Sequence, residues 1–563
     1  MSDEFLVMSD ELFANNRGAD SVNEQSIPTG HSSLITHHSS LIRWLERATV
    51  ACLFLYAVAA PHSIAGTQTA WLLAMLFWVV RLLVRPRPKL FRTPVDAWLL
   101  GFFVLTFLTA LTSYDPEVSI GKLRAASLFT IVYVVAENVR SPRVMRALVL
   151  TLVASCALGL VHTFGVYARG RGVKMYALSA DSPLRASGFL EGDTILSVDG
   201  AEVRSPVEVV RAIETERPST REHVYRFPDG TPACKWDEHA ACVRVYRAEA
   251  LPTGNVPREA LPRGDTAEAR LRIGAWTFGR DERASGFYGQ YQTYAEVLQL
   301  IASLALGLFV SLRRKVSLKG ALVGAALAGM CVALIMTLTR ASWAGFLVSA
   351  LTIALVGASR RTLLVTVGVA LPLILAGLFV LQQKRQVGFI DTKEGSTAWR
   401  LMVWREGARV LLSEPRHLVV GVGMDSLKRH WREWGMFDHG RQPWGHLHST
   451  PLQIAFERGL PTLLVWAAWL FVYGRMLWRM ARGDSSGGDF SDGKSSGSDS
   501  SGGRWVERGL VIGALGGLVG FLSAGLVHYN FGDSEVVMVF YLVMGLTLAA
   551  ERFRRLDAGA QAV

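Results

Sequence analysis

Residues 321–340 read Ala321-Leu-Val-Gly-Ala-Ala-Leu-Ala-Gly-Met330-Cys-Val-Ala-Leu-Ile-Met-Thr-Leu-Thr-Arg340, an apolar run with no charge before its last residue. About twenty such residues are enough to cross the ~30 Å hydrocarbon core of a bilayer as a helix. Similar runs recur along the 563 residues, of which 50% are hydrophobic. The sequence therefore predicts an all-α, polytopic membrane protein.

About twelve transmembrane helices are expected from runs of this length. They fall at residues 47–65, 69–85, 95–113, 121–138, 146–168, 292–312, 319–338, 342–358, 362–383, 459–479, 508–527 and 534–551.

Basic residues set the expected orientation, because Lys and Arg collect in cytoplasmic loops. With a cytoplasmic N-terminus, the segments that fall inside are all basic, at 85–89, 140–143, 313–315, 360–361, 475–482 and 552–555. The formal net charge of +12 is then a feature of membrane topology, and no nucleic-acid partner is expected.

The spans and the polar segments between them define the domain organisation. The chain divides at 1–44, 45–168, 170–285, 286–383, 384–458 and 459–556. In order, these are a disordered polar tail, spans 1–5, a soluble insert, spans 6–9, a long loop and spans 10–12. The last segment includes a Ser/Gly-rich linker at 483–503. The alternation places both termini and this linker in the cytoplasm, and the insert and the long loop on the periplasmic side.

The insert has a readable order of strands and turns. Thr194 to Val198 alternates as a strand, Asp199-Gly200 is typical of a tight hairpin turn, and 205–213 reads as a capped helix. With Ser182-Pro183 and Gly192-Asp193, this spacing resembles a circularly permuted bacterial PDZ domain over about 170–250. PDZ domains bind extended peptides by strand addition.

Two features of the insert leave its chemistry open. Arg171-Gly-Val-Lys174 stands where a PDZ domain has its carboxylate-binding loop, so both peptide binding and a structural or lid role are retained. Cys234 and Cys242 flank a short polar stretch, and on the periplasmic side they form either a disulfide or two free thiols.

A PDZ-like domain in a membrane protein also suggests intramembrane proteolysis. A metalloprotease needs His-Glu-x-x-His on a span, and the chain has no such motif. A rhomboid-type serine protease needs an intramembrane histidine, but Gly357-Ala-Ser-Arg360 lies on the cytoplasmic side with no histidine nearby. Neither protease class is expected.

Arginines gather on the side of the membrane where cations are otherwise scarce. Arg340 either reaches for lipid headgroups or, held by a very short turn before the next span, serves a function at the membrane surface. Arg400 and Arg405 lie in 396–412, which reads as a helix that lies on the lipid interface or grips a lipid-linked phosphate. The two interpretations of this helix are compatible.

Histidines follow these arginines in the long loop. His446 and His448 could form a metal pair, but no cysteine or carboxylate stands at ligand spacing around them, and we expect no metal. A histidine pKa near neutrality suits a general base. A base beside an anion site is therefore the favoured interpretation.

A set of motifs carries a family resemblance. They are Thr337-Leu-Thr-Arg340-Ala-Ser-Trp343, Arg400 with Trp404, Gly421-Val-Gly423, His448-Ser-Thr-Pro-Leu-Gln453 and Glu457-Arg-Gly-Leu-Pro461. In this order they resemble the O-antigen ligase/polymerase family, the Wzy-C superfamily, over about 285–475. Thr339 and Ser449 depart from the Ser and Asn of the family's pattern.

The resemblance implies a GT-C-like glycosyltransferase of the bacterial inner (cytoplasmic) membrane. It would move a glycan from undecaprenyl diphosphate to an acceptor hydroxyl, with inversion. Arg340 and Arg400 would bind the diphosphate, and His448 would deprotonate the acceptor. Arg405, His446 and Gln453 are secondary site residues. No metal or other cofactor is implied, because the donor already carries its leaving group.

Several functions remain open at this point. Ligation of O-antigen to lipid A–core comes first, followed by polymerisation of the glycan on its carrier. A protein O-oligosaccharyltransferase would give the insert a peptide or protein partner. The non-enzymatic alternatives are a PDZ scaffold or a transporter, and a transporter would show internal repeats and polar residues at mid-membrane.

Overall fold

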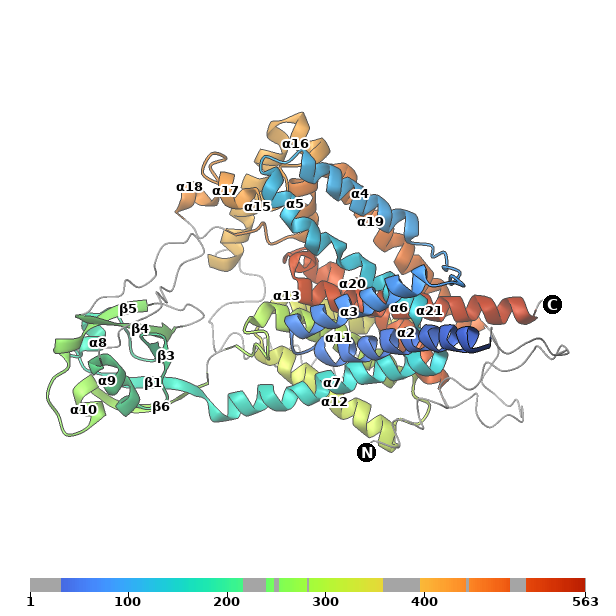
Figure 1. The fold of residues 1–563 in the computed structure, drawn as a ribbon. Coiled ribbons are helices and arrows are strands. Elements are labelled where there is room, and N and C mark those ends of the chain that lie inside the picture. The colour runs from blue at the N-terminus through green and yellow to red at the C-terminus, as the bar shows by residue number, and fades with distance from the viewer. Residues whose placement is uncertain are drawn as a thin grey trace.

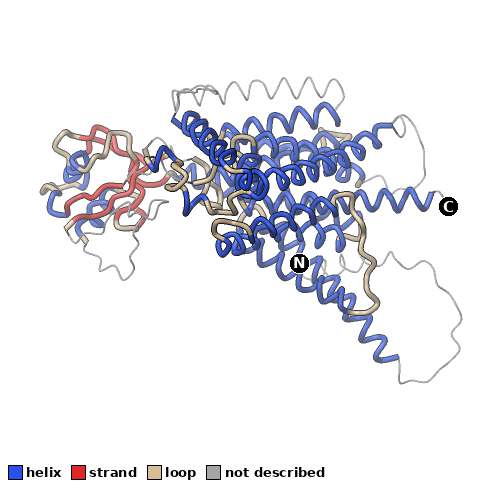
Figure 2. Tube along the Cα trace, turned by 90° about the horizontal axis from the view of Figure 1, so that it is seen from above, coloured by secondary structure: helices blue, strands red, loops and turns tan. Residues whose placement is uncertain are grey.

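The computed structural model describes residues 32–215, 239–247, 253–280, 283–357, 395–441, 445–486 and 503–561. Most of these residues are helical. The long helices form a bundle, and a small unit that contains a β-sheet lies at one end of it (Figure 1, Figure 2).

The part of the bundle before the insert contains six helices and one short 3-10 turn. They are α2 (Ser32–Ala59), α3 (Ile64–Leu83), α4 (Asp96–Leu111), α5 (Pro116–Ala126), η2 (Ser127–Phe129), α6 (Thr130–Asn138) and α7 (Pro142–Arg169).

After the insert, the long helices are α11 (Tyr291–Ser311), α12 (Leu318–Met336), α13 (Arg340–Gly357), α19 (Thr450–Ser486), α20 (Arg504–Gly525) and α21 (Ser534–Gln561). The segment before α19 carries α15 (Gly395–Ser413), α16 (Pro415–Val420), α17 (Leu427–His430) and α18 (Phe437–Gly440). The 3-10 turn η4 (Asn530–Gly532) joins α20 to α21.

Nine helical segments of the described residues are long and apolar enough to cross a membrane. The polytopic, mainly helical architecture is thus confirmed, but the count of twelve is not. α4 has only 16 residues, α2 is not among the nine, and the run at 362–383 lies outside the described residues.

The first predicted span, 47–65, has the wrong limits. α2 ends at Ala59, and the chain turns through Pro61 and His62 before α3 begins. Proline cannot continue the helical hydrogen bonding, so the apolar character of the run extends past the end of the helix.

Basic loops that the sequence places in the cytoplasm come together at the end of the bundle remote from the insert. Arg81 and Arg140 both pair with Glu46, at 3.0 and 2.6 Å. Arg552 Nη2 donates to Val139 O at 2.6 Å. These contacts bring α2, α3 and α21 together with the turn after α6. The assignment of this end to the cytoplasm stays a prediction.

The centre of the bundle is formed by α11, α20 and α21. Most residues of these three helices are buried inside the protein. α11 and α20 approach closely, because a Cβ on Gly307 would lie 2.4 Å from Gly509 O. Such small residues let helix backbones meet in a membrane. This contact fixes α11, whose first turns carry Gln292 and Glu296, against the helix that leads to His528.

The insert is a sheet with three short helices. Its elements are β1 (Arg171–Leu178), α8 (Pro183–Ala186), β2 (Thr194–Val198), β3 (Ala201–Glu202), α9 (Pro206–Glu214), β4 (Ala240–Tyr246), β5 (Thr253–Pro257), η3 (Arg258–Ala260), α10 (Ala267–Leu271) and β6 (Ile273–Gly279). The strand order is β5-β4-β2-β1-β6, with β3 paired to β2, and all pairs are antiparallel.

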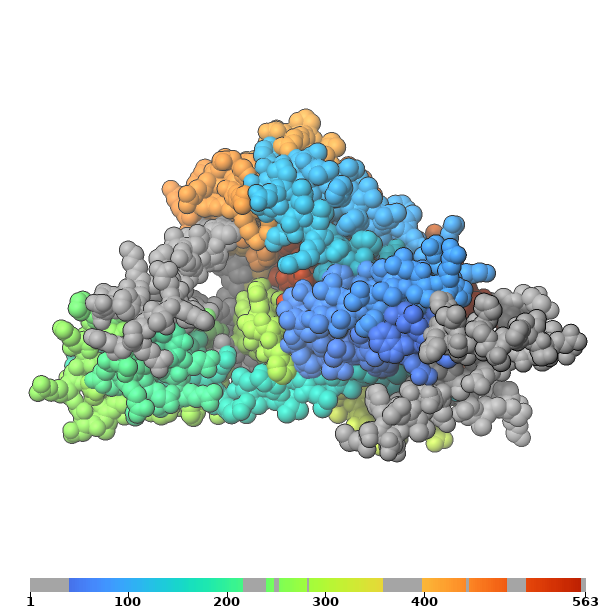
Figure 3. All heavy atoms as spheres, viewed as in Figure 1, coloured from blue at the N-terminus to red at the C-terminus, as the bar shows by residue number. Residues whose placement is uncertain are grey.

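The insert has a core of its own and enters and leaves the bundle at one place. Arg171 and Gly279 are partners in the antiparallel β1–β6 pair, so both connections to the bundle lie side by side. Val173, Ile195 and Val243 are fully buried in a cluster separate from that of the bundle. Figure 3 shows the insert projecting beyond α7, at the end of the bundle where α15–α18 also lie.

The local predictions for the insert hold where they can be compared. β2 coincides with the predicted strand, and α9 begins after Ser205, whose hydroxyl accepts a hydrogen bond from Glu208 N. Asp199 and Gly200 both have positive φ, as the predicted hairpin turn requires. Cys242 is disulfide-bonded, whereas Cys234, its predicted partner, lies outside the described residues. The likeness to a PDZ domain stays a prediction.

Candidate functional site

The segment that carries the site is anchored where Gly421 and Gly423 cross the first turns of α19. Gly423 N donates to Glu457 O at 2.9 Å. That carbonyl is available because Pro461, four residues on, has no N–H to bond it. A Cβ on Gly421 would lie 2.4 Å from Arg458 N, so a side chain there has no room. The Gly-x-Gly and Glu-x-Gly-x-Pro motifs therefore form one packing contact.

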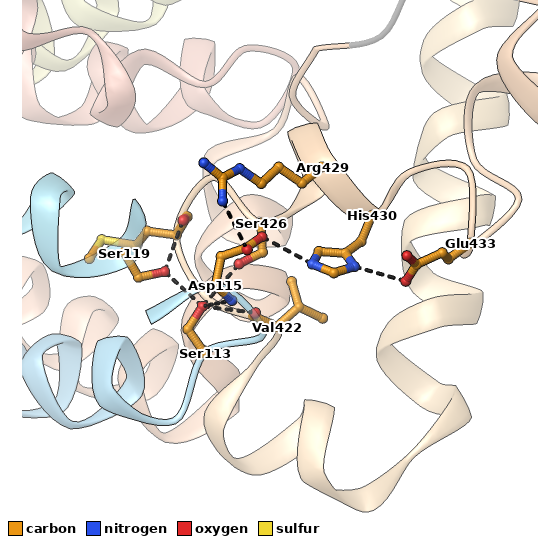
Figure 4. A network of polar contacts seen from close by, with 9 residues as sticks. Ser113, Asp115, Ser119, Val422, Ser426, Arg429, His430 and Glu433 are labelled. Carbon is orange, nitrogen blue, oxygen red and sulfur yellow. Dashed lines mark hydrogen bonds and ion pairs between the residues drawn. The ribbon is translucent and has the colours of Figure 1, made fainter. Parts of the chain in front are cut away.

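A polar network fixes the rest of this segment to the turn between α4 and α5 (Figure 4). Ser113 Oγ lies 2.9 Å from Ser426 Oγ, and it also accepts a hydrogen bond from Ser119 Oγ at 2.8 Å. Asp115 pairs with His430 Nε2 at 3.0 Å and with Arg429 at 3.3 Å. These contacts hold α17 and the residues before it against the bundle.

The loop that carries His446 and His448 lies between α15 and α19. Trp404 Nε1 donates to Leu447 O at 2.7 Å, and Leu447 N donates to Gln453 Oε1 at 2.7 Å. Gln453, predicted as a secondary site residue, thus bonds the backbone between the two histidines. His448 has a φ of +48°, an uncommon conformation for a residue with a side chain. The hydrogen bonds from α15 and α19 to Leu447 hold His448 in this conformation.

A third histidine, His528, completes the cluster. The ring centroids of His446 and His448 are 4.0 Å apart, and they lie 6.0 and 5.8 Å from that of His528. His528 Nδ1 pairs with Glu296 Oε1 at 2.6 Å, and Nε2 lies 3.2 Å from Gln292 Oε1. An acceptor at each ring nitrogen favours the imidazolium form, in which both nitrogens donate.

The surroundings of His528 raise its pKa. Burial alone would lower it, but the negative charge of Glu296 and its hydrogen bond outweigh burial. Asp533 lies beside this pair, and burial together with the Glu296 charge raises the pKa of Asp533 to about 6. The surroundings of His528 therefore favour its positively charged form.

The other two histidines are held in the neutral form. Burial, followed by electrostatic repulsion between the imidazolium forms of His448 and its neighbours His446 and His528, lowers the pKa of His448 to about 2. Burial and the His528 charge lower the pKa of His446 to about 3. A neutral imidazole is an acceptor at one nitrogen. In His446 that nitrogen is Nδ1, which already accepts a hydrogen bond from His448 N at 3.2 Å. His448 is therefore the residue that can take a proton from a bound hydroxyl.

The predicted arginines differ in their positions. Arg400 is half-buried, and its charge lowers the pKa of all three histidines, so it belongs to the cluster. Its neighbour Trp399 packs edge-on against His448, with ring centroids 4.8 Å apart. Arg405 is exposed on α15. No hydrogen bond or ion pair of Arg405 is found within the described ranges.

Arg340 is the first residue of α13 and is half-buried. Three residues separate it from the end of α12 at Met336, and Leu338 in this turn has a φ of +51°. Trp343 Nε1 donates to Leu334 O at 2.7 Å and ties the two helices together. The sequence placed the short turn after Arg340, but in the structure the turn precedes Arg340, which is already part of the next helix.

Sequence reasoning missed Glu296, His528 and Asp533. One ligand atom of each lies within 4.8 Å of the others, so the three side chains could hold a metal ion, although two of them already form an ion pair. Glu296 carried a usable signal, because a carboxylate inside an apolar run marks a functional position in a membrane protein. His528 lies in a loop whose composition signals only a scarcity of cations.

The segment that carries the predicted site residues matches a known protein family. Residues 325–467 match the Wzy_C family model, described as O-antigen ligase. The chain carries a Wzy-C domain. This domain contains Arg340, Arg400, His446, His448 and Gln453 and confirms the family resemblance drawn from the motifs. No curated protein matches the chain.

The domain boundaries leave part of the cluster outside the match. Glu296 precedes residue 325, and His528 follows residue 467. The described fold brings both to the histidine loop, since Thr450 N donates to His528 O at 3.2 Å. The candidate site is therefore assembled from the Wzy-C domain and from helices on either side of it.

Proposed function

We propose that the chain transfers a glycan from undecaprenyl diphosphate to an acceptor hydroxyl, and that this acceptor is lipid A–core. The observation that supports this most directly is a pair of neutral histidines, His446 and His448, within a Wzy-C domain. They lie beside Arg400 and beside His528, whose pKa is raised. The positive-inside rule assigns this end of the bundle to the periplasm of an inner-membrane protein.

The reaction needs one proton acceptor and one anion site. His448 takes the proton of the acceptor hydroxyl, and the hydroxyl oxygen forms a bond to the anomeric carbon. The bond from that carbon to the diphosphate oxygen breaks with inversion, and undecaprenyl diphosphate leaves with the electron pair. Arg400, with Arg340 and the His528 cation, stabilises the charge that develops on it. Arg405 remains a proposed donor contact on the exposed face of α15.

Donor binding tunes the base in this scheme. A histidine with a pKa near 2 is a weak base, and a general base works best with a pKa near the ambient pH. A bound diphosphate neutralises the Arg400 and His528 charges that depress the pKa of His448. The base becomes competent when the donor is in place, which limits proton transfer to the loaded enzyme.

Two other acceptors fit the same chemistry. A polymerase would use a sugar hydroxyl of a second lipid-linked glycan, and a protein O-oligosaccharyltransferase would use Ser or Thr. The separate core of the insert and its β-sheet favour the second of these as the runner-up, because strand addition to a sheet edge is a common way to bind a peptide.

Deletion of the gene in its native host tests the proposal. Loss of glycan from lipid A–core, with long glycan accumulating on undecaprenyl diphosphate, would identify a ligase. Core carrying a single repeat would identify a polymerase. Unchanged envelope glycolipids with altered periplasmic glycoproteins would identify the protein acceptor and overturn the ligase assignment. Complementation with wild type and with His448→Ala then separates the loss of chemistry from the loss of the protein.

A further inference from the structure

A cavity of about 280 Å³ lies between α5, the first turns of α19, η4 and α21. Three cationic side chains line it, from Lys122, Arg124 and Arg458. None of its lining residues is a histidine of the cluster, but Tyr529 lies between the two, with its ring 5.5 Å from that of His446. The cavity is thus a neighbour of the proposed reaction site and has a different set of groups.

Arg458 is the unusual residue of this cavity. Its side chain is 7% exposed, and its guanidinium lies 5.4 Å from the ring centroid of Phe102. Among the residues that the structure describes, the guanidinium has no hydrogen bond or ion pair, and its Nε is buried. Burying a cation without an anionic partner is costly, so the arrangement favours an anion in the cavity.

The two carboxylates of the cavity wall, Asp425 and Glu457, form their ion pairs and hydrogen bonds with groups other than Arg458. Asp425 pairs with Lys122 at 2.6 Å and with Lys428 at 3.1 Å. Burial would raise the pKa of Asp425, but the two ammonium groups outweigh it and lower the pKa. Glu457 Oε1 accepts hydrogen bonds from Asp425 N at 3.0 Å and Gln453 Nε2 at 2.9 Å. Neither carboxylate forms an ion pair with Arg458.

The remaining wall of the cavity is apolar. Phe102, Leu128, Val537 and Tyr541 line it, and they belong to helical segments of the bundle. A cavity with cations on one wall and apolar side chains on the other suits an anion attached to a hydrocarbon chain. The planar guanidinium fork matches a phosphate better than a point charge does.

We propose that this cavity binds the phosphate of a lipid, with Arg458 as its main ligand and Lys122 and Arg124 beside it, as a second anion site next to the histidine cluster. The lipid is an acceptor glycolipid, a prenyl phosphate or a bilayer phospholipid, all of which share this chemistry. The site stands independently of the proposed glycosyl transfer. If that transfer is correct, the site would hold a phosphate while the Arg400 site holds the donor diphosphate.

Binding to the purified full chain in detergent tests the site. The probes are undecaprenyl monophosphate, lipid A with its phosphates and phosphatidylglycerol, and each affinity is measured by native mass spectrometry. Arg458→Met should lower the affinity for the probe that binds about 10- to 100-fold, which is the loss expected when a hydrogen bond to a charged group is removed. Arg432→Met, at an exposed arginine, should bind as the wild type does.

Two controls keep the result interpretable. Arg458→Met removes an unpaired buried charge, so its thermal unfolding temperature without lipid should not fall, which separates lost binding from lost folding. A dephosphorylated form of the bound probe should not compete. Equal affinity of wild type and Arg458→Met for every probe, or no binding to the wild type at all, would overturn the proposal. Lipid binding in a protein that transfers no glycan would reject the proposed function alone.

Discussion

At the scale of single residues, the site depends on three histidines whose pKa values are shifted in opposite directions. Glu296 pairs with His528 and raises its pKa, whereas burial beside His528 lowers the pKa of His446 and of His448. The positive charges that lower the pKa of His448 in the empty site would be neutralised when an anionic donor enters, so this pKa would rise. The pH dependence of the reaction should therefore differ between free and loaded enzyme.

We predict that the acidic limb of the kcat profile lies at higher pH than that of kcat/KM. The kcat/KM profile reports the free enzyme, in which the pKa of His448 is near 2, so activity should hold as pH falls well below 6.5. The kcat profile reports the complex, in which the bound diphosphate raises this pKa. Initial rates with purified protein between pH 4 and about 8 measure both limbs. Coincident limbs would contradict the coupling.

The Glu296–His528 pair predicts a second pH effect, on donor affinity. Because the pKa of His528 is raised, its positive charge is present at low pH and is lost as pH rises through that pKa. Donor binding should weaken over this range in the wild type, and Glu296→Gln should move the weakening to lower pH. Equilibrium binding of undecaprenyl diphosphate to both proteins across the pH range measures this. An unchanged midpoint in Glu296→Gln would show that the His528 charge does not contribute.

At the scale of elements, the described structure explains why two glycine motifs far apart in sequence belong together. The Gly421–Gly423 segment fits against α19 only where Gly459 breaks the helix, with a φ of +78°, and Pro461 leaves a carbonyl open. This contact sets the position of the residues that lead to α17 and of the cavity wall at Asp425. A side chain added here should disturb both.

Gly423→Ala should destabilise the protein, and Gly445→Ala should not. A Cβ on Gly423 would lie 1.8 Å from Ser113 Oγ, and its φ of +99° is strained for any residue with a side chain. A Cβ on Gly445 would meet nothing within 4 Å, and Gly445 has no positive φ, so it is a matched control. We expect a loss of about 1–3 kcal/mol for Gly423→Ala from backbone strain alone. Thermal unfolding in detergent compares the two, and equal stabilities would contradict the packing account.

Local patterns were predictable from the sequence wherever short-range chemistry decides the structure. The helix at 396–412 appears as α15, Gly395–Ser413, and the strand at 194–198 appears as β2. The site was predictable only in part, because motif spacing identifies Arg400 and His448 but not what packs against them. Glu296 and His528 reach the cluster through the close contact of α11 with α20, and this contact depends on tertiary packing.

At the scale of the whole molecule, the insert and the bundle have separate cores. The insert begins at Arg171 and ends at Gly279. These residues are partners in the sheet, so the insert is connected to the bundle at a single place. Both connections lie beside the ends of α7 and the segment that leads to α11. Among the described residues of the insert, none contacts the ring of His446, His448 or His528.

Replacement of residues 171–279 by a short Gly-Ser linker should leave the bundle folded and able to transfer glycan to a lipid acceptor. The reason is that the adjacent ends can be joined without moving α7 or α11. Thermal unfolding and transfer rates of the deletion variant measure this. Loss of transfer with an unchanged unfolding temperature would mean that the insert takes part in acceptor binding, as a protein-modifying enzyme would require.

The central claim is that His448 is the base of a glycosyl transfer from a lipid diphosphate. The most direct test is transfer by the purified protein in liposomes, with undecaprenyl-diphosphate glycan as donor and lipid A–core as acceptor. His448→Ala should lower kcat by about 10²- to 10⁴-fold, the usual contribution of general-base catalysis, whereas His439→Ala, at an exposed histidine of the same segment, should be as active as the wild type. Wild-type kcat in His448→Ala, with correctly folded protein, would contradict the account.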